Sequence, residues 1–159
     1  AFILDAYAFS TEGIVGYSLG KKDLNLFKNI VKNSFILSSI SGLIISIIFF
    51  FTYNLVINLM SDINEIRELS SSYAFWLIIL PVISSFCYQF DGIFIGASQT
   101  KELRNAMIFS VFSYLLISIL LIKFLFNTGI WISLCIFMIL RAVSLFYYLD
   151  KIYLRFRKN

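Results

Sequence analysis

A single acidic residue inside a long apolar stretch does most to limit what this chain can fold into. Between Leu69 and Thr100 the only Asp, Glu, Lys or Arg is Asp91, ten residues before Lys101. A helix rises ~1.5 Å per residue, so Asp91 would lie ~15 Å from that cation. This is the middle of a hydrocarbon layer ~30 Å thick. A carboxylate there costs at least ~2.5 kcal/mol unless it faces protein or water. Asp91 is therefore predicted to line a polar space inside a membrane bundle.

The composition favours the membrane class. Hydrophobic residues make up 60% of the chain and charged residues 14%, whereas soluble domains hold ~45–50% apolar and ~25% charged residues. The formal net charge is +4, but the cations are divided between apolar runs and form no basic stripe, so no nucleic-acid partner is expected. The sequence predicts an all-α membrane protein with lipid as its main surroundings.

The apolar runs predict a bundle of about five transmembrane helices. The expected spans are 1–20, 35–60, 71–100, 106–126 and 130–149, followed by a basic tail at 150–159. Residues 21–32 are predicted to form a separate short helix on the membrane surface, because Lys21, Lys28 and Lys32 share one helical face.

Local signals predict how these spans begin, bend and end. Asp62 and Glu65 have the spacing of a capping box at the start of a helix. Pro81 removes one backbone donor inside the third span, which predicts a helix bend and a polar backbone site there. Residues 127–129, Asn-Thr-Gly, predict the turn of a hairpin between two antiparallel helices.

Cations in the connecting segments predict the orientation. The segments 21–32, 101–105 and the tail together hold ten Lys and Arg, whereas 61–69 and 123–129 hold two. Positively charged connections remain on the cytoplasmic side. We therefore expect a multi-pass protein of the cytoplasmic (inner) membrane of a bacterium, with its C-terminus in the cytoplasm.

Two further acids accompany Asp91. Asp5 and Glu12 are seven residues apart, which places both on one face of the first predicted helix. Glu12 is expected at roughly the depth of Asp91, and Asp5 about two turns further out. Acids inside a membrane span commonly mark ion, proton or substrate paths. Asp91, Glu12 and Asp5 are therefore the candidate cation-coupling and substrate-path residues. The alternative for Asp91 is a structural hydrogen bond between helices, and for Glu12 and Asp5 it is structural neutralisation by a partner on another part of the protein.

Small residues predict where helices approach closely. Gly16 with Gly20, and Gly92 with Gly96, form two small-xxx-small pairs. Arg141 in the last span has two interpretations: its side chain reaches the inner membrane surface, which we favour, or it pairs with a buried carboxylate.

The sequence offers no enzymatic or metal-binding pattern. It has no histidine, and its two cysteines, Cys87 and Cys135, each lie alone in an apolar run. They are expected to be packing residues and not disulfide partners or metal ligands. We expect no cofactor, no metal and no enzyme activity.

Three stretches resemble one transporter family. LDAYAFSTEGIVGYSLGKKD (residues 4–23), FDGIFIGASQTKELRNAM (90–107) and WISLCIFMILRAVSL (131–145) resemble stretches of the multidrug and toxic compound extrusion (MATE) family. DGIFIGA…RNAM is typical of its DinF-like branch. Ser98 and Gln99 stand where that branch has Thr and Arg.

The resemblance implies a twelve-helix antiporter of two six-helix lobes, with this chain as the eighth to twelfth helices. Its partners would then be the seventh helix and the N-terminal lobe, and alone it would be inactive. Such proteins export organic cations and other xenobiotics by alternating access, in exchange for H⁺ or Na⁺, and Asp91 matches a cation-site acid on the tenth helix. The alternatives are a lipid-linked oligosaccharide flippase of the same superfamily and a non-transporting membrane assembly subunit. The chain begins with neither Met nor a signal peptide, so we expect the later part of a longer protein.

Overall fold

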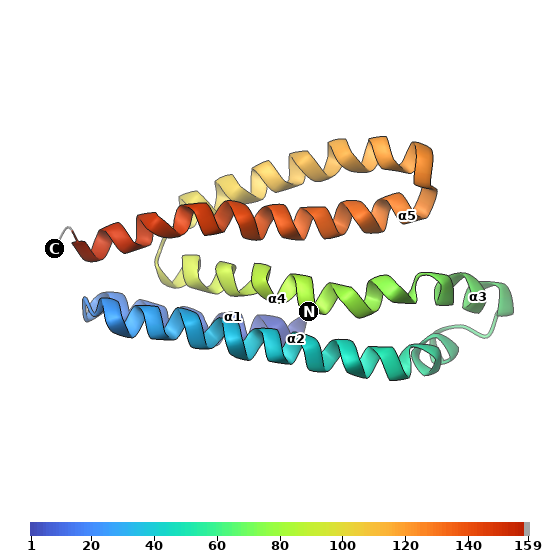
Figure 1. The fold of residues 1–159 in the computed structure, drawn as a ribbon, viewed down its shortest axis with the longest axis horizontal. Helices are drawn as coiled ribbons and strands as arrows, with labels where there is room; N and C mark the ends of the chain where they lie inside the picture. Colours follow the sequence, from blue (N-terminus) through green and yellow to red (C-terminus); the bar gives the residue numbers. More distant parts are fainter. Residues whose placement is uncertain (158–159) are drawn as a thin grey trace.

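The computed structural model describes residues 1–157 and is built from five helices. They are α1 (Phe2–Gly20), α2 (Leu24–Met60), α3 (Asn64–Ser72), α4 (Ala74–Gly96) and α5 (Thr100–Arg157). The long helices run side by side along one axis, and α5 folds back on itself (Figure 1). No strand occurs among the described residues. The predicted all-α bundle is confirmed. Lys158 and Asn159, in the predicted tail, lie outside the described residues, while residues 150–157 continue α5.

The hairpin in α5 turns one residue earlier than predicted. Phe126 adopts φ 49° and ψ −128°, which breaks the helix into a first arm (residues 100–125) and a second arm (127–157). Residues 127–129 therefore begin the second arm. Gly129 lies against the first arm, since a Cβ added there would come within 2.7 Å of the Leu121 carbonyl carbon. Close approach of the two arms thus requires glycine after the turn.

The predicted separate helix at 21–32 is wrong, because α2 runs without interruption from Leu24 to Met60. Asp23 caps its start by accepting a hydrogen bond from the Leu26 amide at 2.9 Å. The fully buried Phe27 ring then packs against Tyr153 and Phe156 of α5. This packing holds the amphipathic first turns in line with the apolar span that follows.

The predicted capping box before α3 is also wrong. The N-cap residue is Ile63, and no side chain caps this helix. Asp62 instead accepts a hydrogen bond from the Arg67 guanidinium at 3.2 Å. The same guanidinium donates to the Ser61 carbonyl at 2.6 Å, so Arg67 ties α3 back to the end of α2. The third predicted span also starts later than expected, because α4 begins at Ala74 and not at residue 71.

The end of α4 also differs from the predicted boundary at residue 100. Ser98 has φ 53°, and its amide donates to the Ile95 carbonyl while the Gln99 amide donates to the Phe94 carbonyl. This pair of bonds is the Schellman cap that stops a helix with one left-handed residue. Lys22 ends α1 with the same geometry. Two parallel helices therefore finish alike at one end of the bundle.

Helix α4 is the centre of the bundle and contacts α1, α2 and α5. In its most apolar 18-residue stretch, 44% of the residues are buried, against 17% in α2 and 11% in α5. Three helices of the described part are long and apolar enough to cross a membrane: α2, α4 and residues 100–154 of α5. Helix α1, which carries Asp5 and Glu12, is not among them.

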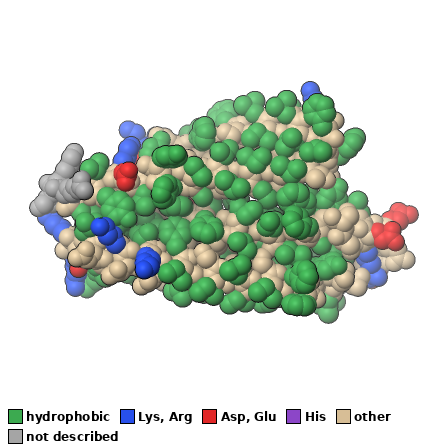
Figure 2. Space-filling model, viewed as in Figure 1, with side chains coloured by type: hydrophobic (Ala, Val, Ile, Leu, Met, Phe, Trp, Pro, Cys, Tyr) green, Lys and Arg blue, Asp and Glu red, His purple; other side chains and the backbone are tan. Residues whose placement is uncertain are grey.

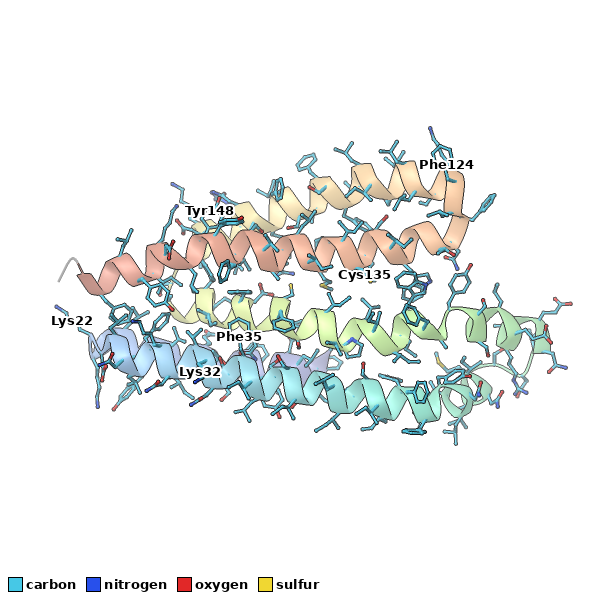
Figure 3. All side chains as sticks on the ribbon, in the orientation of Figure 1. Lys22, Lys32, Phe35, Phe124, Cys135 and Tyr148 are labelled. Carbon is cyan, nitrogen blue, oxygen red and sulfur yellow. The ribbon has the colours of Figure 1, made fainter. Side chains whose placement is uncertain are left out.

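The outer surface is apolar between two charged ends. Figure 2 shows a broad band of hydrophobic side chains, with Lys, Arg, Asp and Glu gathered toward the ends of the long axis. Lys22 and Phe124 mark opposite ends of the bundle (Figure 3). Large side chains such as Phe51, Leu116 and Phe146 are more than half exposed. A soluble protein rarely exposes an apolar patch of this extent, whereas a lipid-facing surface requires one.

Candidate functional site: a charged pair within the bundle

Asp91 forms an ion pair with Arg141. A terminal guanidinium nitrogen of Arg141, on the second arm of α5, lies 2.7 Å from Oδ2 of Asp91 on α4. The two side chains are only 15% and 14% exposed. The favoured prediction that Arg141 reaches the membrane surface is therefore wrong, and the alternative pairing with a buried carboxylate is confirmed. Packing of the second arm of α5 against α4 brings the guanidinium onto the carboxylate, and their attraction offsets part of the cost of burying both charges.

The pair is incomplete on both sides. Oδ1 of Asp91 and Nε of Arg141 are buried and have no hydrogen-bond partner among the described residues. An arginine facing a carboxylate can form two parallel hydrogen bonds, but here only one is formed. An unsatisfied buried polar atom costs about 1–3 kcal/mol, and more on a charged group. Oδ1 of Asp91 is therefore a buried acceptor that no described residue satisfies.

A second polar contact links α4 to α1. Thr11 and Gln89 are both buried, and the Thr11 hydroxyl lies 2.9 Å from the Gln89 side-chain oxygen and 2.8 Å from the Tyr7 carbonyl. The Tyr7 hydroxyl accepts a hydrogen bond from Ser41 of α2 at 2.8 Å. The Gln89 side-chain nitrogen has no partner among the described residues. Polar contacts thus link α1 to both α4 and α2.

Sequence reasoning missed Thr11 and Gln89. Gln89 stands two residues before Asp91 in the stretch that holds no other charge, which was an available signal. Thr11 carried none, because a lone hydroxyl on a helix usually bonds to the carbonyl of the preceding turn.

The acids of α1 lie on either side of Asp91 along the bundle axis. Helices α1 and α4 run parallel, with Ala8 beside Gly92 and Glu12 beside Gly96. Glu12 therefore lies about one turn nearer than Asp91 to the lysine-rich end of the bundle, the end that holds Lys22. The prediction that Glu12 and Asp91 lie at equal depth is wrong. It measured each depth from the end of its own helix, but α1 extends further along the bundle axis than α4. Asp5 lies within electrostatic range of Asp91.

Neither acid of α1 is buried as deeply as the charged pair. Asp5 and Glu12 are both half-buried. In the described part of the chain neither forms an ion pair.

The predicted glycines differ in what they contact. A Cβ added to Gly92 or Gly96 would overlap the backbone of Ala8 or Glu12, with 2.9 Å to either Cα atom. Gly16 lies opposite the Gly96 carbonyl, and its added Cβ would be 3.5 Å away. Gly20 has nothing within 4 Å of that position. The structure brings Gly92, Gly96 and Gly16 together at the α1–α4 contact and leaves Gly20 outside it.

Pro81 lies inside α4, at its contact with α2. A Cβ added to Gly42 of α2 would come within 2.9 Å of the Pro81 carbonyl oxygen. One turn to either side along α2, Ser46 donates to the Ile78 carbonyl and Ser38 to the Ser85 carbonyl. Hydroxyls of α2 therefore satisfy backbone carbonyls around the proline.

The remaining reactive groups form no further site. Cys87 and Cys135 are free and buried, and Cys135 lies on the side of α5 that faces α4 (Figure 3). The described residues contain no group of three His, Cys, Asp or Glu that could hold a metal ion.

These features define the class: a helical integral-membrane protein with a buried charged pair at its centre. Residues 2–124 match the MatE family, and the chain belongs to that family of transporters. It is 31% identical over 145 residues to DNA damage-inducible protein F of Escherichia coli (strain K12). The alignment covers 91% of this chain and 31% of that protein, so the chain spans about a third of its relative. No solved structure matches.

Proposed function

We propose that this chain is part of a secondary active antiporter that exports organic cations and other xenobiotics in exchange for H⁺ or Na⁺. Membership of the MatE family supports transport, and the acids in the bundle support a cationic cargo or coupling ion. The whole transporter would combine this chain with an N-terminal lobe and a seventh helix, and would work by alternating access. It would lie in the bacterial cytoplasmic membrane with this C-terminus inside.

The unsatisfied oxygen of Asp91 is the observation that carries the proposal. A buried carboxylate whose one oxygen binds Arg141 and whose other oxygen has no partner among the described residues can bind a cation through that second oxygen. Asp5 and Glu12 add negative charge along the same path, which raises the local concentration of cations. The three acids are thus proposed to line the path of the cargo or of the coupling ion.

Arg141 is proposed to act as the resting counter-ion of Asp91. A cation that binds to Asp91 competes with the guanidinium for the carboxylate, and displacement of Arg141 would loosen the contact between α4 and the second arm of α5. This links binding to a change in helix packing, as alternating access requires. The exchange replaces one counter-charge by another, so the carboxylate is never left buried and alone.

Replacing Asp91 with Asn in the complete gene product tests the proposal. The variant keeps the volume of the side chain and removes its charge. Cells that express it should retain a fluorescent organic cation such as ethidium, whereas cells with the unchanged protein should export it. Glu68→Gln, in the exposed helix α3, is the matched control and should export normally. Normal export by Asp91→Asn at equal protein level would contradict the proposed role.

A further inference from the structure

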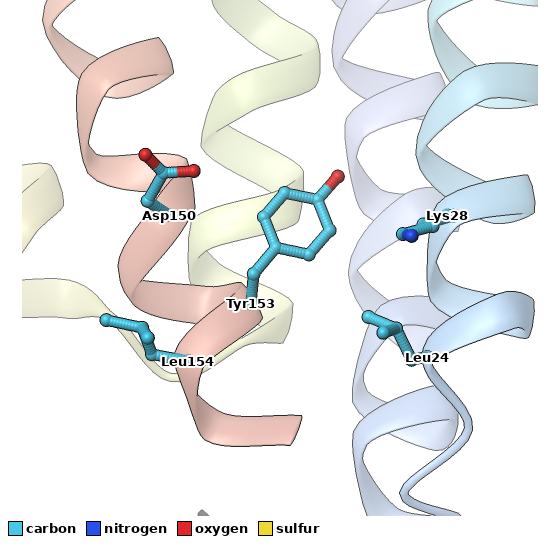
Figure 4. A pocket seen from close by; sticks show the side chains of 5 residues that line it. All are labelled: Leu24, Lys28, Asp150, Tyr153 and Leu154. Atoms are coloured by element: carbon cyan, nitrogen blue, oxygen red, sulfur yellow. The ribbon is translucent and has the colours of Figure 1, made fainter. Parts of the chain in front are cut away.

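Two hollows lie end to end between α2 and the second arm of α5. The first, near the lysine-rich end, has a volume of about 490 Å³ (Figure 4) and is lined by Leu24, Lys28, Asp150, Tyr153 and Leu154. The second, of about 460 Å³, has Phe35, Phe86, Phe90, Val143 and Phe146 among its lining residues.

The two hollows form one crevice. On α2 the lining residues Leu24, Lys28, Val31 and Phe35 follow each other at spacings of four, three and four residues, which is one stripe of a helix. On the opposite wall, the lining residues Phe146, Asp150 and Tyr153 of α5 follow each other at spacings of four and three residues. The crevice therefore extends along the bundle axis from the charged end into the apolar band, and Phe86 and Phe90 of α4 line its deeper part.

The polarity of the crevice changes along its length. The hollow at the charged end offers an ammonium, a carboxylate and a phenol, whereas the deeper hollow is lined by apolar side chains only. Phe86, Val143 and Phe146 are also exposed at the outer surface, so the deeper part opens toward the surrounding lipid. A phospholipid aligned with the membrane normal has this order of groups, with its headgroup at the interface and its chains below.

The charges at the mouth are of opposite sign. Lys28 on α2 and Asp150 on α5 lie on facing walls, with the Tyr153 ring between them (Figure 4). Neither forms an ion pair with any residue that the structure describes. A phosphate beside Lys28 would meet a cation. A primary ammonium beside Asp150 would meet a carboxylate that can accept hydrogen bonds from its N–H groups.

We propose that this crevice binds a phospholipid whose headgroup carries both a phosphate and a primary amine, as phosphatidylethanolamine does. An anionic headgroup without an amine leaves Asp150 facing negative charge, and a choline headgroup has no N–H to donate. Asp150 therefore sets the selectivity, while Lys28 and the deeper phenylalanines hold the lipid. The proposal does not rest on the proposed transport function.

Native mass spectrometry of the purified complete gene product tests the site. The protein is mixed with equal amounts of phosphatidylethanolamine, phosphatidylglycerol and phosphatidylcholine that carry the same acyl chains. We expect phosphatidylethanolamine to be retained roughly tenfold better than the other two, as expected for one added charge-assisted hydrogen bond. Equal retention of the three lipids would overturn the proposal. Retention of no lipid would also overturn it, because another part of the protein would then fill the crevice.

Two exposed-site variants separate the contributions of the two charges. Asp150→Asn should bring phosphatidylglycerol up to the level of phosphatidylethanolamine, while Lys28→Gln should weaken both. Lys22→Gln removes a cation at the same end of the bundle but outside the crevice, and should leave the lipid preference unchanged. If Lys22→Gln and Lys28→Gln lower retention equally, a general basic surface explains the binding, and the assigned site is wrong.

Discussion

The two flanks of α4 are packed in different ways. Toward α1 and α2, glycines bring the helix backbones close together, with Gly92 and Gly96 against α1 and Gly42 against Pro81. Toward α5 the contact is between side chains, and its only ion pair in the described part of the chain is Asp91–Arg141. Backbone contacts between small residues leave little freedom to shift, whereas a pair of side chains can separate and re-form.

This contrast divides the chain into a fixed part and a movable part. Helices α1, α2 and α4 form one unit held by close backbone contacts and by serine hydroxyls. The α5 hairpin is held to that unit by side chains: the charged pair, and an apolar core in which Leu145 and Ile152 are fully buried. We expect motion during transport at the α4–α5 flank.

Breaking the charged pair should give the largest effect. Arg141→Met removes the counter-charge and leaves the Asp91 carboxylate buried, which costs about 3–5 kcal/mol of folding stability for a buried pair. The measurement is the unfolding midpoint of the purified gene product in detergent.

The double variant Asp91→Asn/Arg141→Met is the control for this prediction. It removes both charges and should recover most of the lost stability, while export stays lost. If the double variant is as unstable as Arg141→Met alone, the two side chains do not act as a pair.

Filling the glycine contact tests the fixed flank. Gly92→Ala places a methyl group against the Ala8 backbone, and overpacking of this kind costs about 1–3 kcal/mol. Gly13→Ala, on α1, is the matched control, because nothing lies within 4 Å of the position of its added Cβ. It should be neutral or stabilise α1 slightly. Equal unfolding midpoints for the two variants would show that the α1–α4 contact is looser than described.

Removing the Thr11–Gln89 contact should have a smaller effect. Thr11→Val keeps the shape of the side chain and deletes its hydroxyl, with a loss of about 1 kcal/mol expected for one hydrogen bond. Export should persist, since backbone contacts still hold α1 to α4. Loss of export at unchanged stability would place Thr11 in the transport path and not in the fixed unit.

The pair at the charged end of α5 should matter least. Lys151 of the second arm donates to Glu102 of the first arm at 3.1 Å; the glutamate side chain is 12% exposed, but the lysine side chain is 53% exposed, so its ammonium remains in contact with solvent. Exposed ion pairs contribute about 0–1 kcal/mol. Glu102→Gln should therefore shift the unfolding midpoint only slightly, as checked by the same assay, and a loss comparable to that of Arg141→Met would contradict this ranking.

The sequence predicted what local chemistry determines. Long apolar runs specify helices that need lipid, and the isolated Asp91 indicated a polar contact in their midst. The predicted separate helix at 21–32 failed because nothing in that segment shows that Phe27 is buried against the distant end of α5. The turn at Phe126 was misplaced by one residue, because Asn and Gly are the commoner turn residues.

Partners across the bundle could not be predicted from the sequence. The choice between the two interpretations of Arg141 depends on how α5 is rotated against α4, and fifty residues separate Arg141 from Asp91. The two glycine pairs looked equivalent, yet Gly96 faces the Glu12 backbone while Gly20 faces open space. Spacing gives the face of a helix, but which helix covers that face is decided by tertiary packing.

Binding of a fluorescent organic cation to the purified gene product tests most directly whether Arg141 holds the cation site of Asp91. Arg141→Gln removes the competitor, so the cation should bind several-fold more tightly than to the unchanged protein, and Asp91→Asn should abolish that binding in both backgrounds. Binding that is unchanged by Arg141→Gln and by Asp91→Asn would contradict the account, because the charged pair would then be a structural contact alone.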